Sequence, residues 1–154
     1  PLRFRLPNPP PVFVGRREES GALADAIRRA PVSVVWGLGG SGKTPFVLHT
    51  LRPRFPRKVE RTLFVPLRPG AASPEVEVAR VLAEATKSRI EWTAASAEGL
   101  VAVAIDLAET GPWWIVVEDR QTAVPSRATA LLEAFAKYAR KSRLIAASAN
   151  ARRL

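Results

Sequence analysis

The most distinctive chemistry in the sequence lies in a stretch that combines small residues with one lysine and one threonine. Gly37 is followed by four residues and then by Gly42, Lys43 and Thr44, which is the pattern of a phosphate-binding loop. Small residues let successive backbone N–H groups surround an anion, and a helix that begins there adds the positive end of its dipole. We therefore expect a nucleotide triphosphate to bind here, at Gly37, Leu38, Gly39, Gly40, Ser41, Gly42, Lys43, Thr44 and Pro45.

The polar side chains of this loop have separate expected roles. Lys43 would reach the β- and γ-phosphates, and the hydroxyl of Thr44 would bind Mg²⁺. Pro45 falls in the first turn of the expected helix, where the missing N–H costs little. The alternative is a glycine-rich turn that only joins a strand to a helix. Because the whole pattern is present between a strand-like and a helix-like segment, we favour the nucleotide site.

Two adjacent acids follow an apolar run later in the chain. The segment "WIVVED" places Glu118 and Asp119 directly after four apolar residues. At the carboxyl end of a buried parallel strand, such acids lie beside the phosphates of a nucleotide and can hold its metal ion. They could also be simple turn residues. Beside the phosphate-binding loop we favour a functional pair, with Lys43, Glu118 and Asp119 as candidate catalytic residues and Thr44 and Glu118 as candidate metal ligands.

Strand-like segments alternate with helix-like segments along the chain. β-branched and aromatic runs predict strands at Val32–Trp36, Thr62–Leu67, "WWIVVED" and Arg143–Ser148. Strands that alternate with helices in this way predict a parallel sheet covered on both faces. The expected fold class is therefore α/β, a three-layer sandwich of the P-loop NTPase type.

Apolar residues at helical spacing predict the covering helices. One is expected from Arg17 to Ala30, and one after the glycines to about Arg52, closed by Pro53. Ser73 and Pro74 form an N-cap and first-turn pair, and another helix begins at Ser96 and runs toward Gly111. A last helix is expected over Ser126–Lys141. The residues expected to face the core are Val78, Val81, Leu82 and Ala85, then Leu100, Val103, Ala104 and Leu107, and finally Leu131, Leu132, Phe135 and Tyr138.

Composition narrows the class of protein. The 154 residues are 47% apolar, which suits one globular domain with a proper core. The chain has no cysteine and a single histidine, His49, which excludes disulfides, thiolate metal sites and histidine clusters. No apolar run reaches the length of a membrane span, and no secretory leader is visible, so we expect a cytoplasmic protein without a membrane partner. Five prolines predict an extended arm over residues 1–11, and residues 12–154 form the expected nucleotide-binding core.

The formal charge of +10 raises the question of a nucleic-acid partner. The arginines, however, occupy several separate segments and are not interleaved with aromatic residues. We therefore favour solvated surface charge over a nucleic-acid-binding face, and the second interpretation stays open.

Four motifs in order resemble those of the STAND nucleotide-binding domains, which are signal-transduction ATPases related to AAA+ proteins. The motifs are "PPPVFVGRREESGAL", "VVWGLGGSGKTPF", "WWIVVED" and "SRLIAASAN". The resemblance implies that ATP or ADP binds with Mg²⁺, and that the fourth strand lies between the first and the third. It also implies adenine contacts from Val12, Phe13, Val14, Gly15 and Arg16, phosphate contacts from Gly37 to Thr44, metal and water contacts from Glu118 and Asp119, and a γ-phosphate contact from the end of the fourth strand.

Two departures from that family pattern bear on hydrolysis. Glu118 stands where the family usually has aspartate, and Ala147, Ser148 and Ala149 stand where it usually has two threonines and an arginine. Ser148 or Asn150 could serve as a polar sensor or simply cap the strand end. The family's helical lid and winged-helix domain are not expected in a chain that ends at Leu154. We therefore expect slow or no ATP hydrolysis.

The expected function is a nucleotide-dependent switch in a larger regulator, which assembles with copies of itself or with a partner protein. The alternative is a degenerate NTPase scaffold that binds protein or nucleic acid. A phosphotransferase is a weaker alternative, because the sequence contains no evident segment for binding an acceptor.

Overall fold

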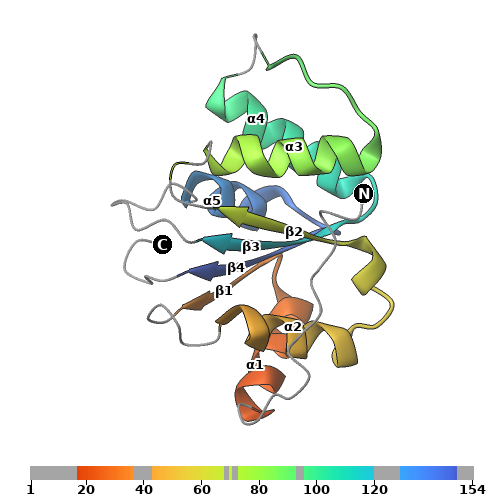
Figure 1. Ribbon diagram of the computed structural model, residues 1–154, viewed down its shortest axis with the longest axis vertical. Coiled ribbons are helices and arrows are strands. Elements are labelled where there is room, and N and C mark those ends of the chain that lie inside the picture. Colours follow the sequence, from red (N-terminus) through yellow and green to blue (C-terminus); the bar gives the residue numbers. More distant parts are fainter. Residues whose placement is uncertain are drawn as a thin grey trace.

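The computed structural model describes residues 17–36, 43–67, 70, 73–92, 96–119 and 129–148, with the backbone alone at Arg17, Glu18, Trp36, Lys43, Val59, Asp119 and Ser148. Within these residues a four-stranded sheet is covered by helices on both faces (Figure 1). The α/β three-layer architecture expected from the sequence is confirmed.

All pairings within the sheet are parallel. The strands are β1 (Val32–Trp36), β2 (Thr62–Leu67), β3 (Trp114–Asp119) and β4 (Arg143–Ser148). Their order across the sheet is β1-β4-β3-β2, so β4 lies between β1 and β3 as the family resemblance implied. In Figure 1 the four arrowheads point to the same side, so one edge of the sheet carries every carboxyl end.

The helices form two unequal layers. Helices α1 (Arg17–Arg29) and α2 (Lys43–Arg54) cover one face of the sheet. Helices α3 (Pro74–Thr86), α4 (Ala97–Glu109) and α5 (Thr129–Tyr138) cover the other (Figure 1). A short 3₁₀ helix, η2 (Val59–Arg61), leads into β2.

The central strand β3 contributes to both hydrophobic cores because successive side chains point to opposite faces. Trp114 and Val116 pack with α1 and α2, while Ile115 and Val117 pack with α3, α4 and α5. These four residues are all buried. By the same alternation, the side chain of Glu118 faces the layer that contains α2.

Helix α2 extends beyond its expected end. Pro53 lies inside its last turn instead of closing it. The backbone N–H of Phe55 still donates to the carbonyl of Leu51 at 2.8 Å, and the Phe55 ring packs edge-on against Trp114 with centroids 5.0 Å apart. Tertiary packing therefore holds a turn that the proline alone would disfavour.

Helix α5 ends earlier than predicted, at Tyr138 instead of Lys141. The carboxylate of Glu109, at the end of α4, accepts the backbone N–H groups of Arg140, Lys141 and Ser142, which are therefore not available for helical bonds. The prediction that Tyr138 faces the core was wrong, because its side chain is 58% exposed. Leu131, Leu132 and Phe135 are buried as expected.

The two predicted serine N-caps behave differently. The Ser96 hydroxyl accepts the backbone N–H of Gly99 at 3.0 Å, which confirms it as the cap of α4. Ser73 occupies the N-cap position of α3, but its side chain makes no capping hydrogen bond. Its backbone carbonyl accepts from Val76 and Glu77 instead.

Candidate functional site

The register of the sheet brings the ends of three strands together. Trp36 at the end of β1 pairs with Ser148 at the end of β4, and Ser148 pairs with Asp119 at the end of β3. In an open parallel sheet, the crevice outside these carboxyl ends is where ligands bind. The carboxyl ends of β1, β3 and β4 therefore meet at one edge of the sheet.

Helix α2 packs against both the sheet and α1, which holds it next to this edge. Phe46, Val47, Leu48 and Leu51 are buried between α1 and the sheet. The hydroxyls of Ser20 on α1 and Thr50 on α2 lie 2.8 Å apart and share a hydrogen bond. This packing sets the position of the first turn of α2, which begins at Lys43.

The central contact of the site joins α2 to β3. The hydroxyl of Thr44 donates a hydrogen bond to the carboxylate oxygen Oε2 of Glu118. Glu118 is only 8% exposed, and Thr44 is half-buried. The first turn of a helix carries unpaired N–H groups and a partial positive charge, so a carboxylate is electrostatically favoured there. The two candidate metal ligands are therefore neighbours in space.

The oxygen atoms of Thr44 and Glu118 are ligands that suit Mg²⁺. Magnesium takes oxygen ligands at about 2.0–2.1 Å in octahedral geometry, so two adjacent ligands on one ion lie roughly 2.9 Å apart. A hydroxyl and a carboxylate that share a hydrogen bond are already close enough to bind one ion together. The described residues contain no group of three or more His, Cys, Asp or Glu side chains able to hold a metal. One or two protein ligands, completed by phosphates and water, are typical of nucleotide-bound magnesium.

Only some of the remaining predicted site residues lie within the part of the chain that the structure describes. Lys43 is the first residue of α2, and Asp119 and Ser148 are the last residues of β3 and β4. Pro45 lies in the first turn of α2, half-buried, as expected. The predicted contacts of Val12–Arg16 and Gly37–Gly42, the arm over residues 1–11, and the sensor candidate Asn150 lie outside the described residues.

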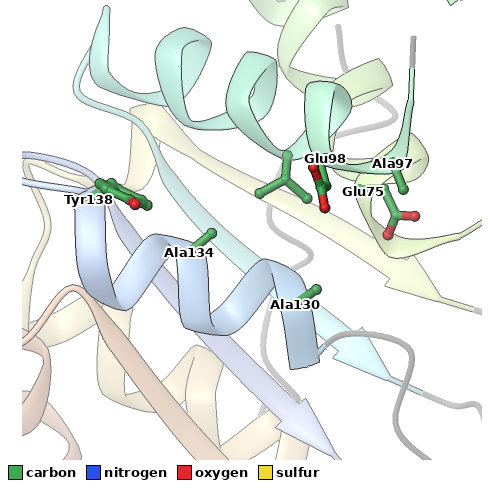
Figure 2. Close-up of a pocket in the computed structure, with 7 residues that line it drawn as sticks. Glu75, Ala97, Glu98, Ala130, Ala134 and Tyr138 are labelled. Carbon is green, nitrogen blue, oxygen red and sulfur yellow. The ribbon is translucent and has the colours of Figure 1, made fainter.

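The helical layer on the other face of the sheet contains a pocket that was not predicted from the sequence. This pocket of about 490 Å³ opens between α3, α4 and α5, where Ala130 and Ala134 of α5 point toward α4 (Figure 2). Glu75 and Glu98 lie at one end and Tyr138 at the other. The pocket is lined by Glu75, Ala97, Glu98, Val101, Ala130, Ala134 and Tyr138.

Within the described part of the chain, no helix combines the length and the apolar character that crossing a membrane requires.

Comparison with known proteins identifies a family to which the chain is similar. The family model described as Novel STAND NTPase 1 matches residues 4–149, nearly the whole chain. No curated protein matches the sequence.

Several solved structures are similar. One is a STAND protein with a tetratricopeptide repeat sensor from Pyrococcus horikoshii, at 16% identity and a TM-score of 0.66, covering 100% of this chain and 23% of that one. Another is the ORC2 protein of Aeropyrum pernix in ADPNP and ADP complexes, at 16% identity and a TM-score of 0.65, covering 94% and 43%. A third is Cdc6p of Pyrobaculum aerophilum, at 15% identity and a TM-score of 0.57, covering 92% and 40%. The chain thus shares their fold and spans less than half of each.

Proposed function

Because the chain belongs to the Novel STAND NTPase 1 family, we propose that it is the ATP- and ADP-binding switch domain of a regulatory ATPase. The observation that carries this proposal is the contact between Thr44 and Glu118 at the carboxyl edge of a parallel sheet. It joins the residue that ends the phosphate-loop pattern to the first acid of the third strand. These are the two protein groups expected to hold the metal of a bound nucleotide.

The other site residues take the roles that the motif assigns to them. The backbone of Gly37–Gly42 surrounds the phosphates, and Lys43 contacts the β- and γ-phosphates as a fixed cation. Residues Val12–Arg16 contact the adenine. When bound, Mg²⁺ neutralises phosphate charge and orients the oxygens of the γ-phosphate. Asp119 orients the attacking water, and Ser148 contacts the γ-phosphate from the end of β4.

Hydrolysis is proposed to be slow. Glu118 reaches the metal position with one methylene more than the aspartate of the family pattern, and its carboxylate already accepts a hydrogen bond from Thr44. Ala149 stands where that pattern has an arginine, and a cation that stabilises transferring phosphate is worth roughly 10³-fold or more in rate. A domain that binds ATP tightly and hydrolyses it slowly keeps its two nucleotide states distinct for long periods.

The proposed output is a change of assembly. The γ-phosphate is the group that differs between ATP and ADP, so it can favour one conformation by the difference in its contacts. ADP would hold the domain closed, and ATP would permit association with other copies or with a partner protein. In this proposal residues 12–154 form the nucleotide-binding core, residues 1–11 lead into it, and the whole protein acts in the cytoplasm.

Isothermal titration calorimetry with ATP and ADP tests the binding proposal. The parent chain should bind both, and Lys43→Ala should weaken binding by about 1.5–3 kcal/mol, the range for a hydrogen bond to a charged group. Lys141→Ala is the matched control, because Lys141 is exposed and follows α5 on the opposite edge of the sheet. No heat of binding for the folded parent would reject the nucleotide function and favour the degenerate scaffold.

A further inference from the structure

Cations that are scattered in the sequence are gathered by the fold. A helix between parallel strands runs against them, so its carboxyl end lies beside the amino end of the next strand. The edge opposite the nucleotide site therefore collects the ends of α1, α2 and α5 and the turns that follow them (Figure 1). We call this surface the basic edge; its exposed cations are Arg28, Arg29, Arg54, Arg57, Lys58, Arg61, Arg140 and Lys141.

Contacts between side chains show that these segments are contiguous. The guanidinium of Arg28 lies over the Phe55 ring at 5.0 Å, and Phe55 packs on Trp114. The ammonium of Lys58 lies 5.9 Å from the centroid of that same Trp114 ring. Aromatic rings that lie beneath cations therefore connect four segments. These are the end of α1, the end of α2, the start of β3 and the turn before β2.

The contacts continue around the sheet to β4. Arg61 lies over the Trp113 ring at 5.9 Å, and the Trp113 carbonyl accepts the backbone N–H of Arg143. The Arg143 guanidinium donates to the carbonyl of Ile27 at 2.7 Å, which returns to the end of α1. The basic edge is thus one connected surface. Arg143 connects two parts of it, because it hydrogen-bonds to both Trp113 and Ile27.

The turns that carry the cations are well defined. Between α2 and β2, the backbone N–H of Lys58 donates to the carbonyl of Phe55. The carbonyl of Lys58 in turn accepts the backbone N–H of Arg61 and, at 2.7 Å, the hydroxyl of Thr62. After α5, Glu109 accepts the N–H groups of Arg140 and Lys141. Glu109 thereby holds two of these cations in place; Asp25 pairs with Arg28 at 3.0 Å, and Glu60 lies exposed on η2, so the basic edge includes acids among its cations.

Helix dipoles explain only part of this arrangement. Cations in the last turn of a helix, such as Arg28, Arg29 and Arg54, are favoured by the negative end of the dipole. Arg57 and Lys58 lie beyond the end of α2, where that effect has fallen off. Arg57 and Lys58 therefore add positive charge to this surface beyond what the helix dipole accounts for.

We propose that the basic edge binds the phosphate backbone of double-stranded nucleic acid, without sequence preference. Most of its cations are arginines, whose planar guanidinium groups match phosphate oxygens in pairs. Phe55 and Trp113 are half-buried and Trp114 is buried beneath cations, so these rings offer no platform for unstacked bases. Backbone contacts of this kind position a protein on a duplex and carry no sequence information.

Fluorescence anisotropy with a labelled duplex of about 20 base pairs tests the proposal, using the full chain at a series of salt concentrations. The parent should bind with micromolar affinity at about 50 mM salt, and log K should fall linearly with log salt. The triple variant Arg57→Gln, Lys58→Gln, Arg61→Gln should bind at least tenfold more weakly, with a salt slope smaller by about 2 to 3.

The matched control removes the same charge from another surface. Arg80, Lys87 and Arg89 are exposed on α3 and the turn after it, so Arg80→Gln, Lys87→Gln, Arg89→Gln should change affinity less than twofold. Arg140→Gln, Lys141→Gln provides a second test of the edge if the first variant proves unstable by thermal melting.

Several outcomes would overturn the proposal. Equal losses in the edge variant and the control would mean that net charge alone attracts DNA. Tighter binding of single strands would point to base stacking, and equally tight binding of polyglutamate or of phosphatidylserine vesicles would assign the edge to another anionic partner. Calorimetry with ATP on the edge variant keeps this test separate from the proposed switch, because nucleotide binding should be unchanged.

Discussion

The hydroxyl of Thr44, in the first turn of α2, donates a hydrogen bond to the carboxylate of Glu118, the fifth residue of β3, across 74 positions of sequence. Thr44 is placed by a helix buried between α1 and the sheet. Glu118 is placed by the alternation of β3, which points it toward the same layer as Trp114 and Val116. Neither residue approaches the other through local structure, so the contact is a property of the fold.

Glu118→Asp tests whether this acid faces the metal in turnover. The shorter side chain restores the spacing of the family pattern, so single-turnover phosphate release should become faster in the presence of Mg²⁺. Asp119→Asn should abolish the activity that remains, because the group proposed to orient the attacking water is lost. If neither substitution changes the rate, the two acids are not the catalytic site, and if the parent is already as fast as an ordinary ATPase, the proposal of slow turnover fails.

The contribution of Glu109 to stability should depend on pH. Burial raises the pKa of this carboxyl, but backbone hydrogen bonds from Arg140, Ser142 and Lys141 outweigh it and leave the pKa lowered. A carboxyl with a lowered folded pKa stabilises the fold above its unfolded pKa of about 4.5 and loses that effect as the pH falls through the folded value.

Glu109→Gln should therefore lower the free energy of unfolding at pH 7 by about 1 kcal/mol, after allowance for solvent screening. The difference from the parent should shrink as the pH falls below about 4.5. Urea unfolding at several pH values measures it, and a difference that does not vary with pH would show that the charge on Glu109 is irrelevant.

The two serine caps predict unequal effects of the same substitution. Ser96→Ala removes a side-chain hydrogen bond to Gly99 and should cost about 1 kcal/mol. Ser73→Ala removes no such bond and should cost less than half as much. Urea unfolding of both variants compares them directly, and equal losses would contradict the capping geometry.

Phe135→Ala tests the larger core. Phe135 is fully buried among α3, α4, α5 and the sheet. Truncation of such a ring leaves a cavity and should destabilise the protein by about 3–5 kcal/mol. Tyr138→Ala on the same helix is the control, because its exposed ring should contribute little. A thermal or urea melt in which Tyr138→Ala costs as much would contradict the burial pattern.

The strands were predictable because each is a short run of apolar and β-branched residues bounded by turn residues, as at Val32–Trp36 and Arg143–Ser148. The helix ends were not. Phe55 carries α2 past Pro53 by packing on Trp114, and Glu109 stops α5 before Arg140, and both contacts join residues distant in sequence. Local patterns contain no information on such partners, which also explains the error at Tyr138.

The candidate site was predictable in its residues but not in its contacts. Thr44 and Glu118 could be selected from motif spacing, because phosphate and metal chemistry restrict the residue types allowed there. The basic edge could not, since its cations belong to segments that only the parallel topology brings to one side. The sequence therefore suggested dispersed charge where the fold produces one surface.

The most direct test of the central claim is a double-mutant cycle on the metal dependence of ATP affinity. Calorimetry with Mg²⁺ and with a chelator would be run on the parent, Thr44→Val, Glu118→Gln and the double variant. If Thr44 and Glu118 form one metal site, either substitution should remove most of the affinity gained with Mg²⁺, and the double variant should lose little more. A gain with Mg²⁺ that survives in the double variant would contradict the account.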